Sequence, residues 1–116
     1  MGGKSSRTKG HSFEREVARL FRTIYPGAKR GYQSRDGGKA AADVEGTPYH
    51  IECKRYRKIT SRIIRDAFDQ VRDSGDSRPP LVVVKEDHGS VFVYTDPQVS
   101  YTVTDFLCGS YMGHLG

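Results

Sequence analysis

An acid and a lysine stand two positions apart in the segment ADVEGTPYHIECKRY, residues 42–56. Residues 49–56 alternate as a β-strand does, so Glu52 and Lys54 point to the same face of that strand. Asp43 lies nine residues before Glu52, on the far side of a turn. Folding alone gives no reason to gather two carboxylates and an ammonium, so this segment is the first candidate for chemistry.

The length of the turn decides whether the two acids meet. Residues 42–45 are predicted to form the preceding strand, joined to the next one through residues 46–48. A two-residue loop at 47 and 48 places Asp43 directly opposite Glu52, with Cβ atoms roughly 5 Å apart. A four-residue loop displaces them along the ladder, and a three-residue loop breaks the arrangement unless a bulge restores it.

Two opposed carboxylates repel each other, and a hard divalent cation relieves that repulsion. Oxygen ligands of this kind suit Mg²⁺ or Mn²⁺, and a metal held by few carboxylates keeps positions for water and a phosphate oxygen. Lys54 would then orient the water or neutralise developing charge, which is the logic of phosphodiester hydrolysis. The alternative is a surface hairpin whose acids and lysine form a weak, exposed salt-bridge network.

The positive charge of the chain is concentrated in two places. The net charge is +5, but residues 1–35 hold nine Lys and Arg against two acids, whereas residues 36–116 hold ten against twelve. Six basic residues between 54 and 65 follow one another with no acid among them. Such clusters are typical of proteins that bind nucleic acid. Our candidates for DNA contact are Arg7, Lys9, Arg15, Arg30, Arg35, Arg55, Arg57 and Lys58.

The first part of the chain is predicted to be an arm followed by a helix. Residues 1–10 are rich in Gly, Ser and basic residues and indicate a flexible basic arm. Ser12 can cap a helix whose apolar stripe runs from Phe13 to Ile24 and ends before Pro26. Both Glu14 and Glu16 lie at the edges of this stripe, so periodicity does not say which one faces a site. His11 and His50 flank the presumed site and are expected to be bystanders.

The remaining elements make one α/β domain over residues 11–108, with a frayed tail at 109–116. We expect strands at 28–33, 42–45, 49–56, 81–85 and 90–95, and helices at 60–74 and 103–107, with a glycine-containing loop at 34–41. The order is αβββαββ, a mixed central sheet flanked by helices. Several apolar residues suit either a subunit interface or the core, namely Phe68, Tyr94 and the strand Val82–Val84.

The segments GHSFERE and ADVEGTPYHIECKRY resemble the PD-(D/E)XK nuclease superfamily, and more narrowly the Holliday junction resolvases of archaea and some phages. The resemblance runs from about Arg7 to Thr95. In that family a glutamate four residues after a glycine supports the metal site, which selects Glu14 over Glu16. The family's aspartate falls on Asp43 and its Glu-x-Lys on Glu52 and Lys54.

The resemblance carries further expectations. The backbone carbonyl of Cys53 would be another metal ligand, Glu14 would act through water, and a family serine in the loop before the aspartate falls on Ser34. Ala42 stands where the superfamily has its proline.

The implied fold is a restriction-endonuclease-like αβββαββ core. The implied activity is Mg²⁺-dependent endonucleolytic cleavage of four-way DNA junctions by paired symmetric nicks, leaving 5′-phosphates, with Mn²⁺ as a substitute. The implied working species is a homodimer, with no small-molecule cofactor.

Two rival functions stay open. One is a related nuclease acting on duplex, flaps or ends, and the other is a non-catalytic basic module that binds nucleic acid.

No window approaches 18 consecutive apolar residues and no apolar leader precedes residue 20, so neither a membrane-spanning segment nor a secretion signal is expected. Cys53 and Cys108 are far apart and lack a CxxC pattern, which favours a reducing cytoplasm and no zinc site.

Overall fold

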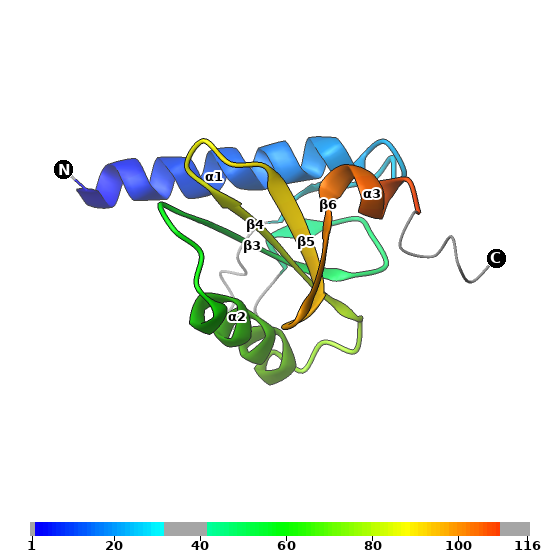
Figure 1. The fold of residues 1–116 in the computed structure, drawn as a ribbon. Coiled ribbons are helices and arrows are strands. Elements are labelled where there is room, and N and C mark those ends of the chain that lie inside the picture. The colour runs from blue at the N-terminus through cyan, green and yellow to red at the C-terminus, as the bar shows by residue number, and fades with distance from the viewer. Residues whose placement is uncertain (1, 32–41, 110–116) are drawn as a thin grey trace.

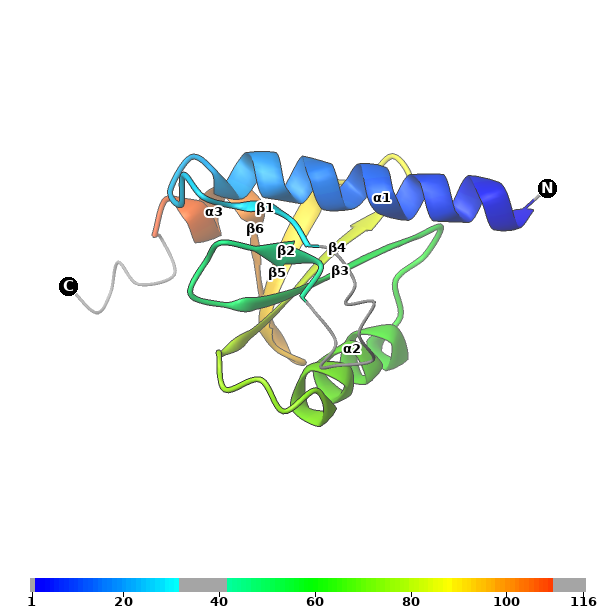
Figure 2. The same cartoon turned by 180° about the vertical axis from the view of Figure 1, so that it is seen from behind.

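A mixed six-stranded sheet between helices forms the centre of the protein (Figures 1 and 2). The computed structural model describes residues 2–31 and 42–109, and side chains from residue 10 onward. In chain order the elements are α1 (Gly2–Phe21), β1 (Lys29–Arg30), β2 (Val44–Glu45), β3 (His50–Tyr56), α2 (Ser61–Asp73), β4 (Pro80–Glu86), β5 (Val91–Asp96), β6 (Val99–Thr102) and α3 (Val103–Leu107). The predicted α/β class with a mixed sheet is therefore confirmed.

The strands lie side by side in sequence order, from β1 at one edge to β6 at the other. All neighbours are antiparallel except β3 and β4, which run parallel from the pair His50 and Pro80 to the pair Tyr56 and Glu86. A parallel pair needs a crossover connection, and α2 supplies it. Helix α1 crosses one face of the sheet and α2 covers the opposite face (Figures 1 and 2).

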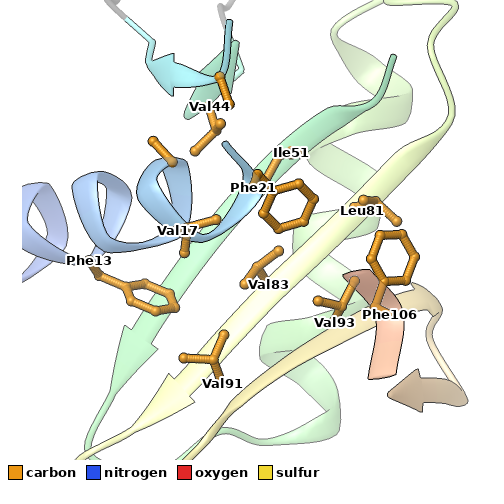
Figure 3. Close-up of a cluster of buried hydrophobic side chains, with 12 residues drawn as sticks. Phe13, Val17, Phe21, Val44, Ile51, Leu81, Val83, Val91, Val93 and Phe106 are labelled. Carbon is orange, nitrogen blue, oxygen red and sulfur yellow. The ribbon is translucent and has the colours of Figure 1, made fainter. Parts of the chain in front are cut away.

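The larger core lies between α1 and the sheet (Figure 3). Phe13, Val17 and Phe21 recur at helical spacing on α1 and are buried, as the apolar stripe predicts. They pack against alternate residues of the strands and against α3, namely Val44, Ile51, Leu81, Val83, Val91, Val93 and Phe106. Ile24, the last residue of the predicted stripe, is instead 49% exposed because α1 ends three residues before it.

A smaller core lies under α2. Ile64 and Ala67 of this helix bury Val82 and Val84 of β4, and Phe68 and Tyr94 pack against them. Of the residues that suited either an interface or the core, Val82, Val83 and Val84 are buried within this chain, whereas Phe68 and Tyr94 are only partly buried. The side chain of Thr60 caps α2 by accepting a hydrogen bond from the Ile63 amide.

Helix α1 is longer than the sequence predicted. Its backbone is helical from Gly2, so Ser12 is an exposed mid-helix residue and not its N-cap, and the predicted flexible arm is helical over residues 2–10. Gly and Ser are weak helix formers, so local propensity gives no sign of this extension. Once residues 13–21 are packed on the sheet, adding turns costs little, because nucleation is the unfavourable step. The first turns project beyond the sheet (Figures 1 and 2).

A sixth strand was not predicted. β6 follows a turn in which the Asp96 side chain accepts a hydrogen bond from the Gln98 amide, and it pairs with β5 across a register shift. Its residues are mostly exposed, so it carries little of the apolar alternation that reveals a strand. Within the described part of the chain, no helix is both long and apolar enough to cross a membrane.

Candidate functional site

The hairpin of β2 and β3 has the register that brings the two acids together. Val44 pairs with Ile51, which is the register of a loop at residues 47 and 48. Before this pair, Asp43 donates its amide to the Ile51 carbonyl and accepts a hydrogen bond from the Cys53 amide with its carboxylate, so it lies beside the part of β3 that carries Glu52. The hairpin depends on Gly46, whose φ is +87°. A Cβ at this position would collide with the carbonyl of Gly27, so glycine is required for both conformation and space.

Successive peptide groups of β3 point to opposite edges of the strand. The amide of His50 donates to the Pro79 carbonyl beside β4, so Ile51 and Cys53 turn their amides and carbonyls the other way, toward β2. Two bonds agree with this: Asp43 donates its amide to the Ile51 carbonyl at 2.9 Å, and Cys53 donates its amide to Asp43 Oδ2 at 2.8 Å. The Cys53 carbonyl therefore faces the edge where Asp43 lies.

The carboxyl group of Asp43 is in an environment that disfavours its charge. Burial raises its pKa, the nearby Glu52 and Glu14 carboxylates raise it further, and the Cys53 amide and Lys54 lower it, with a result of about 7. Charges from α1 and β3 thus converge on this one side chain. The structure brings four predicted residues together here: Glu14, Asp43, Glu52 and Lys54.

The structure separates the two glutamates that periodicity left undecided. Glu14 Oε1 accepts a hydrogen bond from Arg30 Nε at 2.9 Å, and its charge acts on Asp43. Glu16 pairs instead with Lys85 of β4, at 3.3 Å. Glu14 is therefore the helix glutamate that belongs to this cluster. Arg30, expected to contact DNA, is the ion-pair partner of Glu14.

A set of ionic hydrogen bonds joins the candidate site to the loop after α2, and no sequence pattern indicated it. His50 is 1% exposed; its Nε2 lies 3.1 Å from Glu52 Oε1 and its Nδ1 lies 2.8 Å from Asp76 Oδ2. Asp76 accepts hydrogen bonds from Arg78, which hold the pKa of Asp76 well below its usual range. Arg78 Nη1 also donates to Glu45 Oε1 at 2.8 Å. We call Glu45, His50, Asp76 and Arg78 the hairpin network.

The other cationic candidates are spread around this cluster. Arg55 Nη2 lies 3.6 Å from Asp87 Oδ1, and its buried Nε has no hydrogen-bond partner among the described residues. Arg15, Arg57 and Lys58 are exposed. Four predicted residues lie where side chains are not described, namely Arg7, Lys9, Ser34 and Arg35.

A cleft of about 480 Å³ opens beside Lys54, between the N-terminal half of α1 and the end of β3. Its lining is mainly basic and aromatic and consists of Gly10, Cys53, Lys54, Arg55, Tyr56, Arg57 and Asp87. Because β2 pairs with β3 only at the start of the strand, this end of β3 has no described strand on that side. The cleft thus adjoins both Lys54 and the basic run.

The side chain of Cys53 is partly buried and packs against the α1 core. Burial, followed by the charge of Asp43, raises the pKa of its thiol well above its usual value. The direct hydrogen bond between Cys53 and Asp43 comes from the backbone amide of Cys53. Cys108, at the C-cap of α3, is exposed, and both cysteines are free.

In the described residues, no three side chains of His, Cys, Asp or Glu are arranged to hold a metal ion. The donors that converge at the hairpin are two carboxylates and one backbone carbonyl. Mg²⁺ accepts such a set, because it usually keeps several waters and binds one or two carboxylates together with substrate phosphate. Comparisons with protein-family models, with curated proteins and with solved structures found no match.

Proposed function

We propose that this protein is a Mg²⁺-dependent endodeoxyribonuclease with a restriction-endonuclease-like core, acting on four-way DNA junctions. The observation that carries the proposal is the pair Asp43 and Glu52. Two carboxylates are held together at a partly buried position, and the pKa of Asp43 is raised to about 7. Such a pair costs free energy in the absence of a cation, and an enzyme that binds a divalent ion there recovers it.

Asp43, Glu52 and the Cys53 carbonyl would hold the metal, and Mn²⁺ would substitute for Mg²⁺. When bound, the ion would supply Lewis-acid stabilisation of the charge that develops on the phosphate. The Cys53 amide holds Asp43 Oδ2 in place, so this carboxylate is oriented before any ligand arrives. Glu14 adds negative charge near Asp43, and Arg30 fixes its position from the side of β1.

Lys54 is proposed to act on the attacking water. Its side chain lies on the same face of β3 as Glu52, and its charge reaches Asp43. An ammonium at this position can donate a hydrogen bond that orients the water and can neutralise charge on the phosphate. Hydrolysis by this route would leave a 5′-phosphate, as the family resemblance implies.

The basic cleft beside Lys54 supports a DNA substrate. Arg55 and Arg57 line it, and a guanidinium group can bind phosphate oxygens through two parallel hydrogen bonds. Lys58 lies next to this lining on the exposed segment after β3. Phosphate contacts of this type give sequence-independent affinity and fix the position of the backbone.

The preference for junctions is drawn from the resemblance alone. A junction is cut at two symmetric strands, so the proposed working species is a homodimer with two sites on one junction. Since both cysteines are free, we place this activity in a reducing compartment, the cytoplasm.

The decisive experiment offers the protein an immobile four-way junction and a linear duplex of the same sequence, with Mg²⁺ or with EDTA. Asp43→Asn is tested beside Asp66→Asn, an exposed acid of α2 that, among the described residues, pairs with Arg62 at 3.9 Å. We expect paired nicks in the junction alone, lost with EDTA and with Asp43→Asn and unchanged with Asp66→Asn. Equal cutting of the duplex would support a related nuclease. Binding without cutting, indifferent to Mg²⁺ and to both substitutions, would support a non-catalytic module.

A further inference from the structure

The hairpin network connects the two strands that carry the candidate metal ligands. One end lies on β3, where His50 Nε2 contacts Glu52 Oε1. The other end lies on β2, where Glu45 Oε2 accepts a hydrogen bond from the Ala42 amide at 3.0 Å. Ala42 directly precedes Asp43. Both proposed carboxylate ligands are therefore attached to the same set of side chains.

The middle of the network comes from a third segment, the loop between α2 and β4. Asp76 Oδ2 is shared by His50 Nδ1 at 2.8 Å and by Arg78 Nε at 2.9 Å. Arg78 then reaches Glu45 with Nη1, so one planar guanidinium links the loop to β2. Asp76 and Glu45 raise the pKa of Arg78, in keeping with a firmly held cation. The loop before β4 is thereby joined to both strands of the hairpin.

The contacts are too specific for an incidental surface cluster. His50 is buried with both ring nitrogens facing carboxylate oxygens. Arg78 and its partners form charge-assisted hydrogen bonds of 2.6 to 2.9 Å. Such bonds are stronger and more directional than exposed ion pairs. By contrast, Arg72 of α2 makes two contacts of 3.2 Å with exposed Asp69 and Asp73.

We propose that the hairpin network fixes the separation of the Asp43 and Glu52 carboxylates and thereby sets the affinity of the site for a divalent cation. His50, Asp76, Arg78 and Glu45 are positioning residues, since they act through the ligands and not on the substrate. Groups that orient metal ligands commonly change metal affinity by about 10- to 100-fold when they are removed. This inference rests on the proposed function, because it assumes that the two carboxylates bind a metal.

The test measures Mn²⁺ binding to the DNA-free protein by electron paramagnetic resonance or calorimetry. The variants are Arg78→Gln and His50→Gln, and Arg72→Gln is the matched control in an exposed ion pair. We expect each network variant to weaken Mn²⁺ binding by about 10- to 100-fold, and the control to bind like wild type. Arg78→Lys keeps the charge but loses the planar fork, so we expect an intermediate loss. It also serves if Arg78→Gln does not fold.

A second readout does not need the metal. Hydrogen exchange of the Ala42 amide reports the bond to Glu45, and exchange of the Cys53 amide reports the bond to Asp43. Arg78→Gln should accelerate exchange at Ala42 in the metal-free protein, and Arg72→Gln should not.

The possible results separate the two proposals. If Arg78→Gln and His50→Gln fold and bind Mn²⁺ as tightly as wild type, or if Ala42 exchange is unchanged in Arg78→Gln, the positioning role is wrong while the proposed function stands. If wild-type protein does not bind Mn²⁺ and Asp43→Asn makes no difference, the proposed function is wrong and the inference is overturned with it.

Discussion

Replacing Asp43 by asparagine should stabilise the folded protein at neutral and higher pH, although it should abolish cleavage. The native structure holds this carboxyl group in a partly buried position facing Glu52, where its negative charge is unfavourable. Asparagine has nearly the same shape and keeps an oxygen that can accept the hydrogen bond from the Cys53 amide. The substitution therefore removes the charge with little other change.

The size of the effect follows from the pKa. Folding raises the pKa of Asp43 from 3.8 to about 7, so the unfolded chain releases this proton more readily than the native protein. Ionisation of this carboxyl group therefore leaves the free energy of unfolding unchanged well below pH 3.8. It lowers that free energy increasingly between pH 3.8 and about pH 7, and by its full amount above about pH 7. A difference of about three pKa units corresponds to about 4 kcal/mol. In metal-free buffer, the advantage of Asp43→Asn should grow from well under 1 kcal/mol near pH 4 to about 4 kcal/mol near pH 8.

Urea unfolding of both proteins in EDTA, at several values between about pH 4 and about pH 8, measures this difference. Asp66→Asn is the control, and its difference from wild type should stay small across the range because that side chain is exposed. Adding Mn²⁺ at about pH 8 should stabilise wild type and not Asp43→Asn, since the substitution removes one carboxylate of the proposed metal site. A stability difference that does not change with pH would refute the raised pKa and the reasoning built on it.

Three further predictions test the site and its support. Lys54→Met should lower the cleavage rate by about 10²- to 10⁴-fold with junction affinity nearly retained, as single-turnover cleavage and a binding titration would show; a rate near wild type would remove Lys54 from the mechanism. Gly46→Ala should lower the free energy of unfolding by about 3 kcal/mol in chemical denaturation, because Gly27 must move. Gly75→Ala, at φ +78° with open space around it, should lower it by about 1 kcal/mol. Equal losses of stability would contradict the crowding at Gly46. Arg57→Gln should weaken DNA binding and reduce the salt slope in anisotropy titrations by about 1, and an unchanged slope would place Arg57 away from the phosphates.

Local patterns predicted the parts of the fold that are built from short-range rules. Helices α2 and α3 formed close to the predicted ranges 60–74 and 103–107. The β2–β3 hairpin was predicted with its loop length left open, and the pairing of Val44 with Ile51 is the register of the two-residue loop among those alternatives.

The features that were missed depend on contacts between distant segments. Alternation along β3 places His50 on the face of Glu52, but no local signal shows that Asp76, 26 residues later, meets the same imidazole. Arg30 was expected to contact DNA because its charge is visible in the sequence, whereas its pairing with Glu14 across 16 residues is not. Sequence patterns thus indicated the proposed ligand residues and not the side chains that contact them.

The way in which Cys53 takes part in the site has a practical consequence for thiol chemistry. Its backbone contacts the Asp43 carboxylate, whereas its thiol packs against the core. Burial raises the pKa of that thiol, which therefore stays protonated at neutral pH. Alkylating reagents attack the thiolate, so the raised pKa and partial burial of Cys53 should make it react slowly in the native protein. The chain has two cysteines, and the other, Cys108, is exposed at the C-cap of α3. A maleimide dye should therefore label the unmodified sequence faster at Cys108 than at Cys53, which provides a fluorescent reporter without any substitution near the hairpin.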